Sequence, residues 1–244
     1  MSLIRVLING SKGRMGQESV KAVSADPELD LVAQTDLSDN LPEIIEQTKA
    51  QVVVDFTTAS VALEVSVSII QSGARPVIGT SGLLPEQVAE LQKLCKKNKL
   101  GGVIAPNFAI GAVLMMKYAQ DAAKYFPQAE VIELHHDGKV DAPSGTAIKT
   151  ANLIAEARTS SPQTNAEKEI IPGARGANAE GIHIHSVRLP GLVAHQQVLF
   201  GGQSQTLTIR HDSIHRDSFM PGVCLACKKV MDLNELVYGL EHLL

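Results

Sequence analysis

Short β-branched runs alternate with segments of helical spacing along the first hundred residues of the chain. Apolar runs such as IRVLIN and QVVVDFT are bounded by small polar residues, whereas the segments between them repeat apolar positions at helical spacing. Strands that alternate with helices indicate βαβ crossovers and a mostly parallel sheet with helices on both faces. The predicted strands are 4–9, 29–36, 51–57, 75–80 and 101–107, and the clearest helices end near Ala25 or span 61–71 and 85–98.

The pattern changes after Pro106. A helical run over 111–125 leads to the strand EVIELHH, and a further helix is expected near 144–157. Beyond a polar, Gly-rich stretch from about 158 to 181, three segments alternate with a period near two, which is typical of antiparallel strands. These segments are GIHIHSVRLPG, AHQQVLFGG and SQTLTIRHDS, and the pattern from Arg216 onward is helical again.

These two patterns predict an α/β protein with two kinds of sheet. We expect a Rossmann-like parallel domain over 1–106 and a smaller α+β domain with a mostly antiparallel sheet over 107–215. The last segment, 216–244, is predicted to return as helix to the first domain. Ligands bind such parallel sheets at the carboxyl ends of their strands.

Charge and composition narrow the class of partner. The 244 residues carry a formal net charge of -4, and the 22 Lys and Arg are scattered, which argues against a nucleic acid or a membrane surface. A small molecule is the expected partner. The chain shows no apolar run long enough to span a membrane and no secretion signal, so we expect a cytoplasmic protein.

The three cysteines predict no disulfide framework, because their number is odd and Cys95 lies far from the others. Cys224 and Cys227 form a CLAC sequence that could bind a metal or carry out redox chemistry. The flanking apolar residues Val223, Leu225 and Val230 favour a buried helix face instead.

A glycine-rich turn, NGSKGRMG, follows the first strand and begins a helix. Gly10 permits a tight turn, Gly13 allows the backbone to approach a phosphate, and Gly16 allows close helix–strand packing. Asp36 ends the second strand at the distance expected of an acid that binds the adenosine ribose. Together these features predict a dinucleotide site. Leu37 follows where an Arg would bind a 2′-phosphate, which favours NADH, although Lys12 and Arg14 could accommodate NADPH.

The second domain contains the segment EVIELHHDGKVDAPSGTA. His135 and His136 end a strand, Lys139 lies in the following loop, and Ser144 is a predicted helix N-cap. Backbone N–H groups at Gly145 and Thr146, at the positive end of that helix, would bind a carboxylate. A metal site using the His pair with Asp137 or Asp141 is the alternative, but an acid–base histidine beside a cationic clamp fits the pattern better.

This segment resembles the HHxxKxDAPSGTA signature of bacterial dihydrodipicolinate reductases, enzymes of diaminopimelate and lysine biosynthesis. The resemblance extends along the chain through NGSKGRMG, DFT, GTSG, APNFAIG, SVRLPGLVAHQQVLFG and HDSIHRDSFMPGV. It implies reduction of 4-hydroxy-tetrahydrodipicolinate, via dihydrodipicolinate, to tetrahydrodipicolinate. It also implies a homotetramer whose second-domain sheets pack together and whose domains close on ligand.

The resemblance further implies roles for individual residues. His135 would deliver the proton and Lys139 would be a second donor and charge stabiliser. The cyclic dicarboxylate would be bound by His136, Lys139, Gly145 and Thr146. NADH or NADPH would be bound by Gly10, Ser11, Lys12, Gly13, Arg14, Met15, Asp36, Gly79, Thr80, Ser81, Ala105, Pro106, Asn107 and Phe108. No metal is expected.

Some positions depart from the family pattern. Asp137 and Gly138 stand where relatives often have basic or polar residues, which lowers the local positive charge. Two alternatives to the implied activity stay open. One is another NAD(P)-dependent oxidoreductase acting on an anionic imine or semialdehyde, and the other is a non-catalytic nucleotide-binding regulator.

Overall fold

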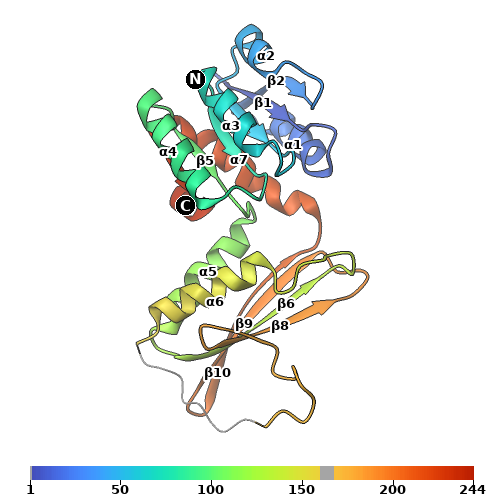
Figure 1. Cartoon of the computed structure of the whole chain (residues 1–244), viewed down its shortest axis with the longest axis vertical. Helices are drawn as coiled ribbons and strands as arrows, with labels where there is room; N and C mark the ends of the chain where they lie inside the picture. Colours follow the sequence, from blue (N-terminus) through green and yellow to red (C-terminus); the bar gives the residue numbers. More distant parts are fainter. Residues whose placement is uncertain (1, 160–167) are drawn as a thin grey trace. The chain divides into compact units, whose positions relative to one another are not determined.

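The computed structural model describes residues 2–159 and 168–244, which form two compact units (Figure 1). Unit 1 comprises residues up to Ile110 together with Arg216–Leu244, and unit 2 comprises Gly111–His215. Residues 107–110, which the sequence pattern assigns to the second domain, thus belong to unit 1. The physical reason is Phe108, which is buried and packs edge-on against Phe56 with ring centroids 5.8 Å apart.

Unit 1 is built on a parallel sheet, as predicted. Within the described residues its six strands lie in the order β11-β5-β4-β3-β1-β2, in which β11 is Leu236–Tyr238 near the C-terminus, and every neighbouring pair is parallel. The first part of the unit alternates strands and helices in the predicted order. Its elements are β1 (Ile4–Asn9), α1 (Arg14–Ala25), β2 (Leu29–Thr35), α2 (Leu41–Thr48), β3 (Val52–Asp55), α3 (Ala62–Gln71), β4 (Arg75–Ile78), α4 (Pro85–Asn98) and β5 (Gly102–Ile104).

Helices cover both faces of this sheet. Leu7, Val53 and Ile78 belong to one hydrophobic core together with residues of α2, α3 and α4. The alternate strand residues, such as Val6 and Val52, are also fully buried, on the face where α1 and α7 (Met220–Lys229) pack. Burial on both faces explains why these strands are uniformly apolar rather than alternating.

The C-terminal segment corrects one prediction. It returns to unit 1 as expected, through η1 (Arg216–Phe219) and α7, but it is not helical to its end. After η2 (Val230–Asp232), strand β11 (Leu236–Tyr238) pairs with β5 and extends the sheet before η3 (Leu240–Leu243). Three residues are too few to display a period, so only the pairing with β5 identifies the strand.

Unit 2 contains a mixed sheet with helices α5 (Ile110–Ala123) and α6 (Gly145–Ala157) on one face (Figure 1). The strand order in the described residues is β10-β9-β6-β8-β7. The antiparallel prediction holds for every pair except β6 and β8, which run parallel because α6 forms a crossover between them. The strands are β6 (Gln128–His135), β7 (Ala177–Ala179), β8 (Ile182–Arg188), β9 (Ala194–Gly202) and β10 (Gln205–Ser213). The polar stretch predicted from 158 to 181 lies partly outside the described residues.

Candidate active site

The glycine turn between β1 and α1 is a tight backbone cradle. Gly10 has φ +75°, and a Cβ there would lie 2.7 Å from the carbonyl oxygen of Phe56. A Cβ on Gly16 would lie 2.0 Å from the carbonyl oxygen of Gly10, to which the Gly13 N–H donates a hydrogen bond of 3.1 Å. Only glycine fits at Gly10 and Gly16, so this turn has the compact shape that lets a phosphate approach a helix N-terminus.

Asp36 lies beside this turn, as the sequence predicts. Its carboxylate accepts hydrogen bonds from the backbone N–H of Lys12 at 3.1 Å and of Leu37 at 2.9 Å. The Leu37 and Lys12 hydrogen bonds lower the pKa of Asp36. An ionised carboxylate can only accept hydrogen bonds, which suits it to bind ribose hydroxyl groups.

A buried polar network lies directly beneath the turn. Asp55, at the end of β3, is fully buried and accepts hydrogen bonds from Asn9 Nδ2 (2.8 Å), Thr57 Oγ1 (3.0 Å) and Thr80 Oγ1 (2.6 Å). Burial raises the pKa of Asp55, and these three hydrogen bonds offset only part of that effect. Asn9 in turn accepts from Thr35 Oγ1 at 2.8 Å, so the network ties together the ends of β1, β2, β3 and β4.

Two of the remaining predicted dinucleotide residues, Gly79 and Phe108, lie against Phe56. A Cβ on Gly79 would collide with the Phe56 ring, and Thr80 binds Asp55, so the loop after β4 is fitted against the loop after β3. The Ala105 N–H donates to Ile78 at 2.9 Å, and Phe108 packs on Phe56. Ser11 is buried in the turn and Asn107 accepts from Ala109, while Ser81 and Pro106 are exposed.

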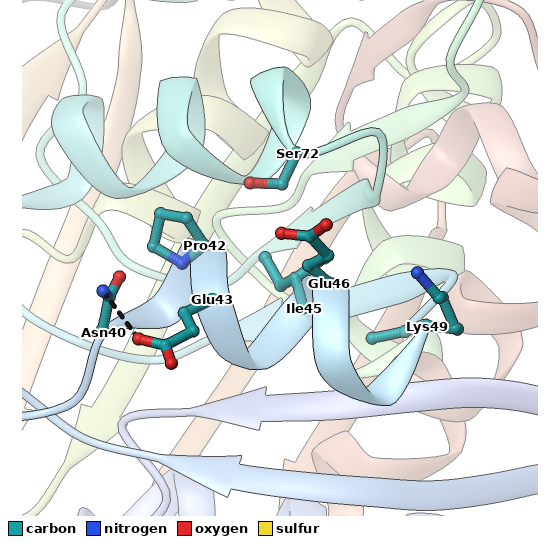
Figure 2. A pocket seen from close by; sticks show the side chains of 8 residues that line it. Asn40, Pro42, Glu43, Ile45, Glu46, Lys49 and Ser72 are labelled. Atoms are coloured by element: carbon teal, nitrogen blue, oxygen red, sulfur yellow. Dashed lines mark hydrogen bonds between the residues drawn. The ribbon is translucent and has the colours of Figure 1, made fainter.

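Two of the hollows in the described part of unit 1 are lined by residues of the segment that follows β2. One, of about 260 Å³, is lined by Asp36, Leu37 and Asp39 together with residues of α3, which places it beside the glycine turn. The other, of about 780 Å³, lies over α2 and Ser72, where Asn40 donates to Glu43 at 3.1 Å (Figure 2). None of the predicted site residues line the larger hollow.

In unit 2, strand β6 ends at His135, so His136 lies outside the strand. The alternation that would send two consecutive strand side chains to opposite faces therefore does not apply to this pair. The chain then turns, with the Lys139 N–H donating to the His136 carbonyl oxygen at 3.1 Å. This turn brings His135, His136 and Lys139 into one short loop region.

The centre of this region is a carboxylate that the site prediction omits. Glu133 is fully buried, and its two oxygens accept hydrogen bonds from Arg188 at 2.8 and 2.9 Å. Glu133 Oε2 also makes a short hydrogen bond with His135 Nδ1, and Glu133 Oε1 accepts from the Ser144 N–H at 3.3 Å. A charged residue inside an apolar strand, within EVIELHH, was the available signal for Glu133. The partnership with Arg188 had no sequence signal.

The ionisation of this cluster follows from its contacts. Burial raises the pKa of Glu133, but hydrogen bonds from Arg188, Ser186 and His135 outweigh burial and hold that pKa below its ordinary value. Burial lowers the pKa of His135, and the hydrogen bond and charge of Glu133 oppose this shift without cancelling it. The site therefore contains a carboxylate that stays ionised beside an imidazole that releases its proton readily.

The part of the region for which anion binding is predicted is formed by a loop and the start of a helix. Lys139 Nζ binds both carboxylate oxygens of Asp141, at 2.7 and 2.8 Å. Ser144 caps α6, as predicted, by accepting a hydrogen bond from the Ala147 N–H at 3.2 Å. Gly145 is exposed, with no atom within 4 Å of the position of a Cβ, so the first turn of α6 is open to a ligand. Thr146 follows it in that turn.

Two alternative chemistries find no support in the described residues. Within 2–159 and 168–244, no group of three His, Cys, Asp or Glu side chains could hold a metal ion. Cys227 is fully buried on α7, and burial raises its pKa and raises the pKa of Cys224 to about 11. Thiols with such pKa values are poor nucleophiles and poor metal ligands at neutral pH.

The parallel sheet of unit 1, with a glycine turn after its first strand, has the Rossmann-like architecture of dinucleotide-binding proteins. Solved dehydrogenases share the fold at low identity, including a probable dehydrogenase from Thermotoga maritima with a TM-score of 0.62 and 11% identity over 98% of this chain and 92% of that one. Such a likeness shows the architecture alone.

The particular family follows from closer matches. Residues 4–108 match the model of the dihydrodipicolinate reductase N-terminus, and residues 111–244 match that of the C-terminus. The chain belongs to the dihydrodipicolinate reductase family. It is 54% identical to the 4-hydroxy-tetrahydrodipicolinate reductase of Coxiella burnetii (strain Dugway 5J108-111), over 99% of each chain. It is 51% identical to that of Listeria monocytogenes serotype 4b (strain F2365), over 99% of this chain and 100% of the relative.

A solved relative matches in structure as well. The dipicolinate-bound dihydrodipicolinate reductase from Paenisporosarcina sp. TG-14 is 49% identical, with a TM-score of 0.91. The match covers 99% of this chain and all of that one. The described part of the chain contains no helix of the length and hydropathy that a membrane span requires.

Proposed function

We propose that the protein reduces 4-hydroxy-tetrahydrodipicolinate, via dihydrodipicolinate, to tetrahydrodipicolinate in the diaminopimelate route to lysine, using a reduced nicotinamide cofactor. The observation that carries this proposal is the cluster in unit 2. An imidazole (His135), an ammonium group (Lys139) and an open helix N-terminus (Gly145) are held in one region by Glu133 and Arg188. The names of the close relatives, and the dipicolinate bound to one of them, support the substrate class.

The chain's own groups suit a cyclic dicarboxylate. Lys139 supplies a positive charge, and the first turn of α6, at Gly145 and Thr146, supplies backbone N–H groups at the positive end of a helix dipole. His136 lies one residue beyond β6 in the same loop and would contact the substrate. Two carboxylates could thus be held at separate positions around a ring.

The cofactor, when bound, supplies a hydride. The glycine turn and Asp36 fit a dinucleotide, because a side chain would collide at Gly10 and Gly16 and because Asp36 is ionised beside the turn. Hydride addition to a conjugated imine creates negative charge on the substrate, which Lys139 would stabilise. His135 would then deliver the proton, since burial lowers its pKa and makes release easier.

Oxidation of NADH in the presence of dihydrodipicolinate synthase and its substrates tests this proposal. We expect a rapid loss of nicotinamide absorbance that depends on the synthase. His135→Gln should lower kcat by about 100-fold while leaving the Kd for NADH within about twofold. Binding of NADH without its oxidation would instead indicate a regulator, and oxidation with a different imine or semialdehyde would indicate another reductase.

For the cofactor, we propose a preference for NADH. The 260 Å³ hollow beside the glycine turn is lined by the acidic side chains Asp36, Asp39 and Glu64 with no Lys or Arg among its lining residues. A 2′-phosphate would add negative charge next to these carboxylates without a guanidinium to compensate. The exposed Leu37 occupies the position at which an Arg would do so.

For the assembly, we propose a homotetramer that buries the open face of the unit 2 sheet. Strand alternation and register place Ile132, Leu134, Val187 and Leu199 on the face opposite α5 and α6, and each is half-buried. Light scattering should detect smaller particles for Leu199→Asp than for the unmodified chain. Tyr125→Asp, at an exposed position after α5, is the control and should stay assembled. A monomeric unmodified chain would contradict this assembly.

We also propose a cytoplasmic location. The three cysteines are free thiols, and Cys95 and Cys227 are buried, which is the usual state of cysteines in a reducing compartment. Cell fractionation would test this location directly.

A further inference from the structure

Glu133 joins three elements of the candidate substrate site, namely β6, β8 and the start of α6. It contacts the His135 ring on its own strand and the Arg188 guanidinium on β8. It also accepts from the N–H of Ser144, the residue that caps α6. Arg188 extends the connection by donating to the Asp141 carbonyl oxygen at 2.7 Å, in the loop that carries Lys139.

The donors around Glu133 require an anion. Oε1 accepts from Arg188 and Ser144, and Oε2 accepts from Arg188 and faces the Nδ1 atom of His135. An ionised carboxylate has no proton to give, so the ring nitrogen facing it must carry one. His135 therefore has Nδ1–H directed at Glu133, in both its charged and its neutral form, and Nε2 is the nitrogen left for the reaction.

We propose that Glu133, held by Arg188, is a positioning residue that fixes His135 in the Nδ1–H tautomer, so that Nε2 delivers the proton to the reduced substrate. The proton leaves Nε2 of the imidazolium and bonds to the substrate atom on which hydride addition has placed negative charge. The remaining imidazole is neutral, keeps its Nδ1–H bond to Glu133 and is reprotonated from solvent at Nε2. This inference rests on the proposed role of His135 as the proton donor.

Glutamine at position 133 would disrupt this arrangement without changing its size. Its amide has one oxygen, which accepts, and one NH₂ group, which donates. The NH₂ group would therefore face N–H groups that need an acceptor. If the amide NH₂ faced His135, the ring would have to present a bare Nδ1, and the proton would move to Nε2. The Arg188 charge would also lose its partner.

Histidine tautomers can be measured without turnover. In ¹⁵N-labelled protein, long-range proton–nitrogen NMR spectra distinguish Nδ1–H from Nε2–H imidazoles. We expect His135, assigned by its loss in His135→Gln, to be Nδ1–H in the unmodified protein and to lose this state in Glu133→Gln. An Nε2–H imidazole in the unmodified protein would overturn the proposal, even if Glu133→Gln failed to fold.

Kinetics supply the second test. Glu133→Gln should lower kcat by about 100-fold or more, as expected when a carboxylate no longer holds a catalytic histidine in its tautomer, with the Kd for NADH within about twofold. The basic limb of the pH–rate profile should move to lower pH, because a negative charge leaves His135 while the Arg188 and Lys139 charges remain. Arg188→Lys should give a smaller loss, because lysine keeps the charge but not the paired hydrogen bonds.

Glu130→Gln is a matched control. Glu130 lies on the same strand and also binds an arginine (Arg175) and a histidine (His185), but on the opposite face of the sheet. It should change neither kcat nor the pH profile, with assembly checked by light scattering. A Glu133→Gln protein that is folded and within about threefold of normal kcat would refute the positioning role. If the tautomer is as expected but His135→Gln is fully active, the proposed proton donor fails while the structural assignment stands.

Discussion

The two candidate sites of this protein are formed by different kinds of chemical group. The candidate dinucleotide site of unit 1 consists mainly of backbone, which is shaped by glycines and supported by a buried hydrogen-bond network around Asp55. The substrate region of unit 2 consists of charged side chains, in which Glu133, Arg188, Lys139 and Asp141 balance one another. A site made of backbone should lose binding when its shape is changed. A site made of charged side chains should lose activity when one of the paired charges is removed. Four experiments test this difference.

The largest effect is expected for Gly16→Ala in unit 1. The new Cβ would lie 2.0 Å from the Gly10 carbonyl oxygen, so the turn must open. We expect a loss of about 2–4 kcal/mol in the free energy of unfolding and at least a 100-fold weaker Kd for NADH. Denaturant unfolding and NADH fluorescence titration measure the two effects.

Gly73→Ala is the control for this substitution. Gly73 also has a positive φ of +79°, but no atom lies within 4 Å of its Cβ position. It should cost about 1 kcal/mol of stability through backbone strain and leave NADH binding unchanged. Equal effects of the two substitutions on NADH binding would refute a role for turn shape.

The next effect is expected for Lys139→Ala in unit 2. Loss of the ammonium should lower kcat/KM by about 100-fold, because the same charge would bind a substrate carboxylate and stabilise the developing anion. A rise in KM alone would reduce Lys139 to a binding residue. Lys124→Ala removes a similar lysine–aspartate pair, with Asp121 at 2.7 Å, and should leave the steady-state kinetics of the coupled assay unchanged.

A smaller effect is expected for Leu37→Arg. A guanidinium beside the acidic hollow should shift the ratio of kcat/KM values toward NADPH by about tenfold. Leu37→Gln, which is polar but uncharged, should shift it much less. An unchanged ratio in Leu37→Arg would mean that Lys12 and Arg14 already determine the cofactor preference.

The smallest effect is expected in the pH dependence of stability, to which two buried carboxylates should contribute with opposite signs. The pKa of Asp55 is raised by burial, so its contribution to stability should be lost as pH rises through that folded-state pKa. The pKa of Glu133 is held below its ordinary value despite burial, so its contribution is present above that value and lost as pH falls through the folded-state pKa. Unfolding curves between pH 3 and 7 for Asp55→Asn and Glu133→Gln, each compared with the unmodified chain, should therefore diverge in opposite directions with pH. If the stability differences of the two variants changed in the same direction with pH, the opposite pKa shifts of Asp55 and Glu133 would be contradicted.

The contrast between local backbone requirements and long-range contacts also explains which features could be predicted from the sequence. Glycine requirements and strand–helix alternation are local, so the cradle at Gly10 and the elements around it follow from short-range pattern. The N-cap at Ser144 is local for the same reason, and the structure confirms it. Strand β11 and the parallel pairing of β6 with β8 depend on partners distant in the chain, and the pattern misses both.

The sequence by itself determined the fold class, the tight glycine turn after the first strand and the family, because each rests on spacing within short segments. Only the tertiary structure decided that Glu133 on β6 and Arg188 on β8 meet, because that contact joins residues far apart along the chain. It also decided that Asp55 is buried among Asn9, Thr57 and Thr80 rather than exposed at a strand end. Burial and charge pairing are properties of packed surroundings, and a side chain acquires them only when distant strands come together.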